Sequence, residues 1–296
     1  MNYYEEIKNK IIDNEIYCKV KDYSKERNIV NTYFEIGRLL TEAGGKYGDN
    51  IIDEYSKRLV VEVGKKYNSR TLRRIRQFYK RFSNENWSPL ATNLTWSHYT
   101  ELLSIKDKNK LLYYLNLASN NNLSRNELRN RIKSKEYERL SESTKEKLIA
   151  NEQPLLPDLV KNPILIKNTN KYNEISEKIL QQIILEDIKN FMKELGNGFS
   201  YISNEYPIKL GDNYSYIDLL LFNYEYNCFV VIELKVTRLK KEHIGQIEVY
   251  MNYIDKNLKK PNQDKTIGII VCRENNEYII EYCSDKRIIA RNYELV

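Results

Sequence analysis

One short run of residues constrains the fold of this chain more than any other. Residues 229–236 read FVVIELKV, which is apolar enough for a strand in the middle of a sheet, yet the run carries Glu233 and Lys235. Successive side chains of a strand point to opposite faces, so these two charged residues share one face, while their apolar neighbours point to the other. Charged side chains in a buried strand are costly, so we expect them to have a charged or hydrogen-bonding partner or a chemical role.

A further charged residue interrupts the apolar run that comes before. Residues 216–222 read YIDLLLF, and Asp218 stands inside this predicted strand, 15 residues before Glu233. Burying two carboxylates on neighbouring strands is costly, and their mutual repulsion raises the pKa of one of them unless a cation lies between them. Carboxylates, carbonyl oxygens and water are the ligands that Mg²⁺ prefers. The pattern therefore predicts a divalent metal site, and an exposed ion pair between Glu233 and Lys235 is the alternative.

The second half of the chain alternates helix and strand patterns. Helices are expected over residues 173–198 and 240–258, and strands are expected at 199–210, 216–226, 228–236, 266–274 and 278–283. This order indicates an α/β domain with a mixed sheet flanked by helices.

The first half is predicted to be helical and basic. Apolar residues recur at helical spacing through residues 4–43 and through the segments that follow. Residues 1–150 hold 29 Lys and Arg against 20 Asp and Glu, whereas residues 151–296 hold 19 against 21. The whole basic excess lies in the first half, which suggests that this half meets a polyanion.

A single segment concentrates this charge. Residues 65–81 contain eight basic residues and no acidic one, and a helix is expected to begin near Asn68, after a turn at Gly64. Helix, short turn and basic helix give the outline of a helix-turn-helix whose second helix enters a major groove. A solvated basic face without a ligand is the alternative. The residues predicted to bind nucleic acid are Arg70, Arg73, Arg74, Arg76, Lys80 and Arg81.

Prolines mark the boundary between the two halves. Three prolines between residues 154 and 163 predict a helical domain over 1–145, a linker over 146–171 and an α/β domain over 172–296.

The four cysteines are far apart and only two histidines exist, which argues against a zinc site and a disulfide framework. With no signal peptide and no apolar run long enough to span a bilayer, we expect a cytoplasmic protein without a membrane partner.

The charged strands resemble a known nuclease core. The strings YIDLLLF and CFVVIELKV resemble the D-(x)n-ExK core of the PD-(D/E)XK nuclease superfamily. Residues 195–236 are similar in particular to its YhcG-like branch, whose members carry a helical domain ahead of the nuclease domain. The first half is similar to that domain, notably in LTWSHYTELL at 94–103 and SRTLRRIRQFY at 69–79. The resemblance covers most of the chain and implies a restriction-endonuclease-like fold for its second half.

The resemblance also implies roles for the charged residues. It makes Asp218 and Glu233 the metal ligands, adds the backbone carbonyl of Leu234 as a further ligand, and makes Lys235 the catalytic lysine. Many members of the superfamily place a polar residue on the helix that follows, and Gln246 is the candidate for a catalytic role there, with Tyr250 four residues later on the same helix face.

An acid from the first helix of the domain often completes the site in this superfamily. Glu177 and Glu186 are the candidates, and Glu186 is taken as the metal ligand, although the expected register falls nearer Gln181. His243 is expected to be a surface residue. If no acid from this helix reaches the metal, coordination is thinner and activity is expected to be weak.

The implied function is that of an endonuclease. The resemblance implies hydrolysis of phosphodiester bonds in duplex or branched DNA, with Mg²⁺ as the cofactor and Mn²⁺ as a substitute, in DNA repair or defence. The helical half would target the enzyme to DNA, and a homodimer is expected because cutting two strands needs two sites. The alternatives are a DNA-binding or regulatory protein with a vestigial nuclease core, and an RNA-directed nuclease.

Overall fold

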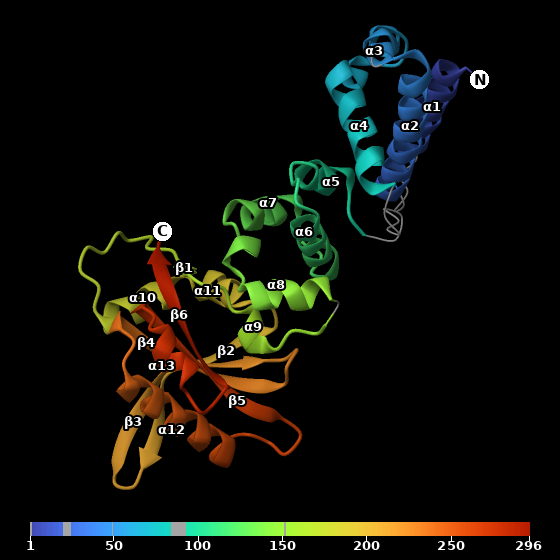
Figure 1. Cartoon of the computed structure of the whole chain (residues 1–296). Helices are drawn as coiled ribbons and strands as arrows, with labels where there is room; N and C mark the ends of the chain where they lie inside the picture. The colour runs from blue at the N-terminus through green and yellow to red at the C-terminus, as the bar shows by residue number, and fades with distance from the viewer. Residues whose placement is uncertain (1, 20–24, 49, 84–92, 151) are drawn as a thin grey trace. The chain divides into compact units, whose positions relative to one another are not determined.

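The chain folds into two compact units. The computed structural model describes residues 2–19, 25–48, 50–83, 93–150 and 152–296, and these divide into units of residues 1–137 and 138–296 (Figure 1). The first unit is helical and the second is built around a sheet. No helix in the described stretches is long and apolar enough to cross a membrane.

The first unit packs its helices around two apolar clusters. Its helices are α1 (Tyr3–Lys19), α2 (Lys25–Tyr47), α3 (Ile51–Glu62), α4 (Ser69–Phe82), α5 (Trp96–Leu102), α6 (Lys108–Asn120) and α7 (Arg125–Lys133), with the 3₁₀ turn η1 (Lys65–Tyr67) before α4. The first cluster contains residues of α1, α2, α3, η1 and α4. The second contains residues of α4, α5, α6 and α7, with Val30 of α2. Helix α4 contributes to both clusters, so it lies at the centre of the unit.

Helix α4 buries one side and leaves the other to solvent. The side chain of Asn68 caps its first turn by accepting a hydrogen bond from the amide of Thr71. Gly37 on α2 permits close packing, because a Cβ at this position would lie 2.6 Å from the carbonyl oxygen of Ile75. The buried stripe follows the helical spacing that the sequence predicts and comprises Leu72, Ile75, Phe78 and Phe82. The predicted sequence of helix, short turn and basic helix is therefore present.

The second unit is a mixed six-stranded sheet with helices on both faces (Figure 1). Its strands are β1 (Ile164–Ile166), β2 (Phe199–Leu210), β3 (Asn213–Asn223), β4 (Cys228–Arg238), β5 (Asp264–Glu274) and β6 (Ile288–Leu295). They lie in the order β1-β6-β5-β4-β3-β2. Strands β2, β3 and β4 pair antiparallel, whereas β4, β5, β6 and β1 pair parallel. The predicted α/β class is confirmed.

Each face of the central strand β4 packs against a different set of helices. Ile232 and Leu234 belong to the cluster with α10 (Glu177–Glu186) and α11 (Ile188–Leu195). Val231 belongs to the cluster with α12 (Lys241–Asn257). Since Glu233 lies two residues from Val231, the alternation of the strand directs it to the α12 face. The charged pair thus follows the alternation predicted from the sequence.

The segment predicted as a linker is a folded part of the second unit. It carries α8 (Glu142–Ile149), α9 (Leu156–Leu159) and strand β1, which pairs with the edge of β6. Arg139 lies just before it and forms a partly buried ion pair with Glu194, 2.5 Å from Nη1 to Oε2. Burial raises the pKa of Glu194, but Arg139 and Lys161 outweigh this effect and hold it below its usual range. The predicted boundaries at 145 and 171 therefore give way to one at 137.

Three further elements differ from the sequence prediction. The helix expected over 173–198 is interrupted at Asp187, whose backbone leaves helical geometry with φ −136° and ψ 48°. The strand expected at 278–283 is instead a short helix, α13 (Glu277–Glu281). Strand β6 was not predicted, because its sequence IIARNYEL mixes polar residues into the apolar run and its identity depends on pairing with β5 and β1.

Candidate active site

The candidate site lies where strands β3 and β4 stop pairing. Their backbone pairs run from Asn223 and Cys228 to Leu219 and Ile232, and Asp218 is the next residue of β3. The carboxylate of Asp218 accepts a hydrogen bond from the amide of Leu234, 2.7 Å from N to Oδ2. A side chain therefore continues the connection between the strands, and this contact places Asp218 beside the Glu-x-Lys segment.

Glu233 is a carboxylate buried with only partial compensation. It is 2% exposed, its Oε1 lies 2.8 Å from Nζ of Lys235, and its buried Oε2 has no hydrogen-bond partner among the described residues. Burial, with the nearby charge of Asp218, raises the pKa of Glu233 to about 7, although Lys235 acts in the opposite direction. Near neutral pH this side chain therefore exchanges readily between its charged and neutral forms.

The two neighbouring charged groups respond to the same environment. Burial raises the pKa of Asp218, and the hydrogen bond from Leu234 and the charge of Lys235 offset only part of this effect. Burial by itself would lower the pKa of Lys235, but the carboxylates around it, with Glu233 first, raise it above its usual value. Lys235 thus stays positively charged at the side of two acids that resist ionisation.

The acid that helix α10 contributes is Glu177. It is the first residue of the helix, and its Oε2 lies 3.4 Å from Nζ of Lys235. Glu186, the predicted ligand, does not join this group, because its carboxylate instead binds Asn170, Tyr172 and Gln182. Glu186 lies nine positions after Glu177, which corresponds to about 13 Å along a helix axis, so one helix cannot place both acids at the same point.

Gln181 supports the site in a way that the sequence prediction missed. It is buried on α10, and its Nε2 donates a hydrogen bond of 3.0 Å to the backbone carbonyl of Asp218. The expected register of the helix acid fell near this residue, but no role was given to it. A buried amide on an otherwise apolar helix face was the available signal, since such a group needs a hydrogen-bond partner.

Helix α12 carries Gln246, the candidate predicted on the helix that follows β4. Gln246 donates to the hydroxyl of Tyr250, 2.9 Å from Nε2, and Tyr250 is packed into the α12 core. Neither residue has a recorded hydrogen bond or ion pair to the three charged residues on β3 and β4. His243, expected at the surface, is half-buried in the first turn of α12. Burial lowers its pKa, and the charges of Lys235 and Lys240 lower it further, so His243 lies within electrostatic reach of Lys235.

The pair of carboxylates fits a divalent cation. The unpartnered Oε2 of Glu233 is an orphaned buried acceptor, and the raised pKa values of Glu233 and Asp218 are those of acids that lack a neutralising charge. Within the described ranges, no three His, Cys, Asp or Glu side chains gather closely enough to hold an ion by themselves. A cation would therefore need further oxygen ligands from the backbone, such as the carbonyl of Leu234, or from water.

The six basic residues predicted to bind nucleic acid all lie on α4 and differ in their contacts and exposure. Arg73 forms an ion pair with Asp53, 2.6 Å long, and Arg81 donates to the carbonyl oxygen of Lys106 at 2.8 Å. Arg70 and Lys80 are exposed on the solvent side of the helix, and Arg74 and Arg76 are partly exposed. Arg81 therefore has a structural task, while Arg70 and Lys80 present their charge to solvent.

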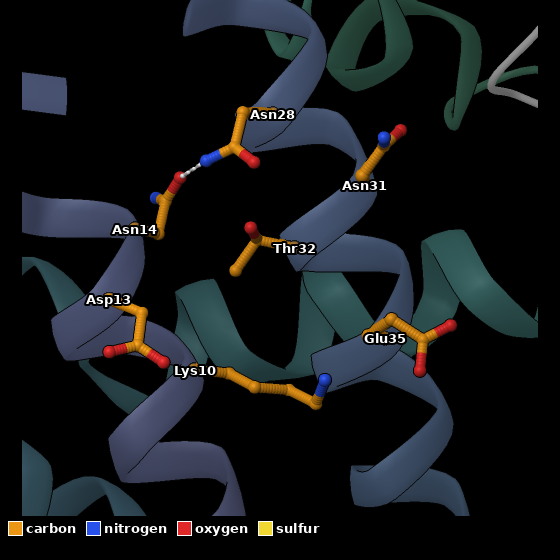
Figure 2. A pocket seen from close by; sticks show the side chains of 7 residues that line it. All are labelled: Lys10, Asp13, Asn14, Asn28, Asn31, Thr32 and Glu35. Atoms are coloured by element: carbon orange, nitrogen blue, oxygen red, sulfur yellow. Dashed lines mark hydrogen bonds between the residues drawn. The ribbon is translucent and has the colours of Figure 1, made fainter. Parts of the chain in front are cut away.

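A separate polar pocket lies between α1 and α2 of the first unit. Figure 2 shows side chains from both helices around it, among them Asn14, whose Oδ1 accepts a hydrogen bond of 2.9 Å from Asn28. The pocket is lined by Lys10, Asp13, Asn14, Asn28, Asn31, Thr32 and Glu35. It contains none of the residues predicted to bind nucleic acid.

Two family models match the chain, one for each unit. The YhcG PDDEXK nuclease domain matches residues 157–296, and the DUF1016 N-terminal domain matches residues 11–139. Among curated proteins, the chain is similar to "Putative nuclease YhcG" of Escherichia coli (strain K12), with 26% identity over 285 residues, which cover 82% of this chain and 76% of that protein. Both the nuclease core and the helical half thus match the same kind of protein.

Solved structures give weaker similarities. A repair endonuclease from Pyrococcus abyssi matches with a TM-score of 0.29 and 20% identity, over 43% of this chain and 49% of that one. A complex titled EndoMS-dsDNA2 matches with a TM-score of 0.28 and 19% identity, over 43% of this chain and 48% of that one. The chain spans about half the length of these proteins, and scores this low carry no functional inference.

The family assignment agrees with the geometry described above. The nuclease model covers Asp218, Glu233 and Lys235, which the fold brings together at the end of the β3–β4 pairing. The helical model covers α4 with its basic face. The chain belongs to the YhcG-like branch of the PD-(D/E)XK nuclease superfamily.

Proposed function

We propose that this chain is a Mg²⁺-dependent DNA endonuclease that its helical unit brings to DNA. The observation that carries the proposal is the buried carboxylate of Glu233, which has one oxygen without a partner, beside Asp218 and Lys235. A protein that needed only a stable strand would gain by replacing such a group with an apolar one. The free-energy cost of burying the Glu233 carboxylate is understandable if a divalent cation binds there, with Mn²⁺ able to substitute for Mg²⁺.

The residues of the site divide the work of phosphodiester hydrolysis. Asp218 and Glu233 would hold the cation, with the carbonyl of Leu234 as a further ligand. When bound, the cation would lower the pKa of a water molecule and offset the charge of the phosphate. Lys235 would orient the attacking water and stabilise the negative charge that develops on the phosphate, which is the kind of electrostatic work that dominates phosphoryl transfer. Glu177 keeps Lys235 charged, and Gln181 fixes the backbone of Asp218.

The exposed basic residues of α4 would supply affinity for the DNA backbone. Arg70 and Lys80 are exposed, and neither has a recorded ion pair within the described residues. Contacts of this kind neutralise phosphates and release counterions without reading the base sequence. In this proposal the helical unit raises the local concentration of DNA at the nuclease unit, and the choice of substrate lies elsewhere.

Replacing Lys235 tests the proposed reaction. We expect Lys235→Ala to lower the rate of Mg²⁺-dependent DNA cleavage by about 10²-fold or more, because a positioned charge at the reacting phosphate is lost. The assay follows linear duplex, branched and single-stranded DNA, and RNA, each with Mg²⁺, with Mn²⁺ or with EDTA. Products with a 5′-phosphate are expected.

The matched control is Lys286→Ala, which removes an exposed lysine of the same unit and should leave the cleavage rate unchanged. Binding of the substrate in EDTA should survive in both variants. If the wild-type chain binds DNA but cuts no substrate with any metal, the chain is a binding protein with a vestigial core. If RNA alone is cut, the DNA assignment is overturned.

The raised pKa of Glu233 predicts how stability depends on pH. A carboxylate with a pKa of about 7 in the folded state and about 4.5 in the unfolded state binds its proton more tightly when folded. The resulting stability is full below pH 4.5 and is lost as the pH rises through 7, and Asp218 acts in the same direction. In EDTA, we expect the free energy of unfolding to fall by up to about 3 kcal/mol between pH 5 and pH 8.

Urea denaturation across this pH range measures the effect. Glu233→Gln keeps the shape of the neutral acid, so its stability should change much less with pH and should exceed that of the wild type at pH 8. The control Glu281→Gln, at an exposed position, should follow the wild-type profile. A wild-type stability that rises from pH 5 to pH 8 would contradict the assigned environment of Glu233.

The basic face of α4 predicts a salt-dependent contribution to binding. We expect Arg70→Ala/Lys80→Ala to weaken duplex DNA binding by about tenfold and to reduce the slope of log K against log salt by about 2, one unit for each lost phosphate contact. Fluorescence anisotropy at several salt concentrations measures both quantities. Lys57→Ala/Lys133→Ala removes the same charge from exposed positions on α3 and α7, and equal losses in both double variants would assign the effect to net charge alone.

A further inference from the structure

The hairpin formed by β2 and β3 exposes a group of aromatic rings next to the candidate site. Tyr214 is 61% exposed and Tyr216 is 56% exposed, and neither hydroxyl has a recorded hydrogen bond among the described residues. They stand two residues apart on β3, so they share one face of the hairpin. Large rings that remain this accessible on a regular strand present a flat apolar surface to solvent.

Both rings lie on the same strand as Asp218, close to the candidate site. Tyr216 precedes Asp218 by two residues and Tyr214 by four, which corresponds to about 7 Å and about 14 Å along an extended strand. Across the hairpin, Tyr216 pairs with Pro207, and Tyr214 pairs with the exposed Lys209. A nucleic-acid strand whose scissile phosphate lay at Asp218 could therefore run along the hairpin, with the basic side chain of Lys209 beside the ring of Tyr214.

An exposed hairpin at the edge of a sheet could also pair with a further strand, but the geometry of β2 argues against this. Strand β2 is the edge of the sheet, and such an edge is open to strand addition unless it is interrupted. Pro207 lacks an N–H group, and Glu205 has a positive φ of 47°, which departs from extended geometry. The regular pattern of edge hydrogen bonds is thus broken beside the exposed rings.

We infer that Tyr214 and Tyr216 form a stacking surface for unpaired nucleobases of the strand that enters the site. The inference rests on the proposed function, because it takes Asp218 as the point at which the strand is cut. Aromatic side chains stack on any base, and each such contact contributes about 1–3 kcal/mol to binding of single strands. Bases inside a continuous duplex stack on one another and are not available to side chains unless they are flipped out. The substrate class is therefore a nucleic acid with unpaired nucleotides next to the scissile phosphate.

Binding of labelled oligonucleotides by the full-length protein in EDTA tests this inference without cleavage. We expect Tyr214→Ala/Tyr216→Ala to weaken binding of a 20-nucleotide single strand by about tenfold or more and to change duplex binding by less than about twofold. Tyr214→Phe/Tyr216→Phe keeps the rings and should bind as the wild type does. An oligonucleotide with abasic positions should lose affinity for the wild type but not for the alanine variant.

The control is Tyr224→Ala, which removes a tyrosine that is 65% exposed just beyond the opposite end of β3. This variant should bind as the wild type does, which separates a local role from the abundance of tyrosine in the chain, 25 of 296 residues. DNA and RNA strands are both measured, and ring-dependent binding of either supports the inference and identifies the polymer. Unchanged single-strand affinity in the alanine variant, or an equal loss on duplex, overturns it.

Cleavage with Mg²⁺ on the same oligonucleotides keeps the two proposals apart. If the nuclease proposal fails, no cleavage occurs although the ring-dependent binding remains. If the stacking surface fails, the wild type and the alanine variant cut single-stranded and duplex substrates in the same ratio although cleavage itself persists. The single variants Tyr214→Ala and Tyr216→Ala repeat the comparison if the double variant does not fold.

Discussion

The burial of Glu233 beside Asp218 is the constraint on which the rest of this site depends. Two neighbouring carboxylates cannot both be charged at low exposure without a compensating cation, and Lys235 forms an ion pair with only one oxygen of one of them. The fold accepts this cost at the point where β3 and β4 separate, where the hydrogen bond from Leu234 to Asp218 replaces a backbone pair. The site is therefore a place where stability has been given up for charge placement.

The surrounding elements hold these charges in position. Glu177 begins α10 within reach of Lys235, and Gln181, one turn later, binds the backbone of Asp218. The same helix buries its apolar face against β4. Helix α10 thus contacts the sheet, Lys235 and the strand that carries Asp218. A change in the angle of α10 would move all three together.

Much of the site could be predicted from the sequence because its signal is local. A carboxylate inside an apolar strand and an alternating Glu and Lys in the next strand are visible without any knowledge of the fold. Which acid of α10 reaches the site depends on where the helix begins and how it lies on the sheet, and the choice of Glu186 failed for that reason. Strands β1 and β6 were missed because they are defined by pairing across the sequence rather than by their own pattern. The segment predicted as a linker folds with the nuclease unit because its apolar residues, such as Leu156 and Ile164, are buried in the core.

Titration with Mn²⁺ followed by electron paramagnetic resonance measures whether Asp218 and Glu233 hold a divalent cation. We expect the wild-type chain to bind Mn²⁺, and Asp218→Asn and Glu233→Gln each to weaken this binding by an order of magnitude or more. We also expect Mg²⁺ to compete for the same site. Equal affinity for Mn²⁺ in the wild type and in both variants would overturn the proposed metal site, because Asp218 and Glu233 would then have no cation to hold.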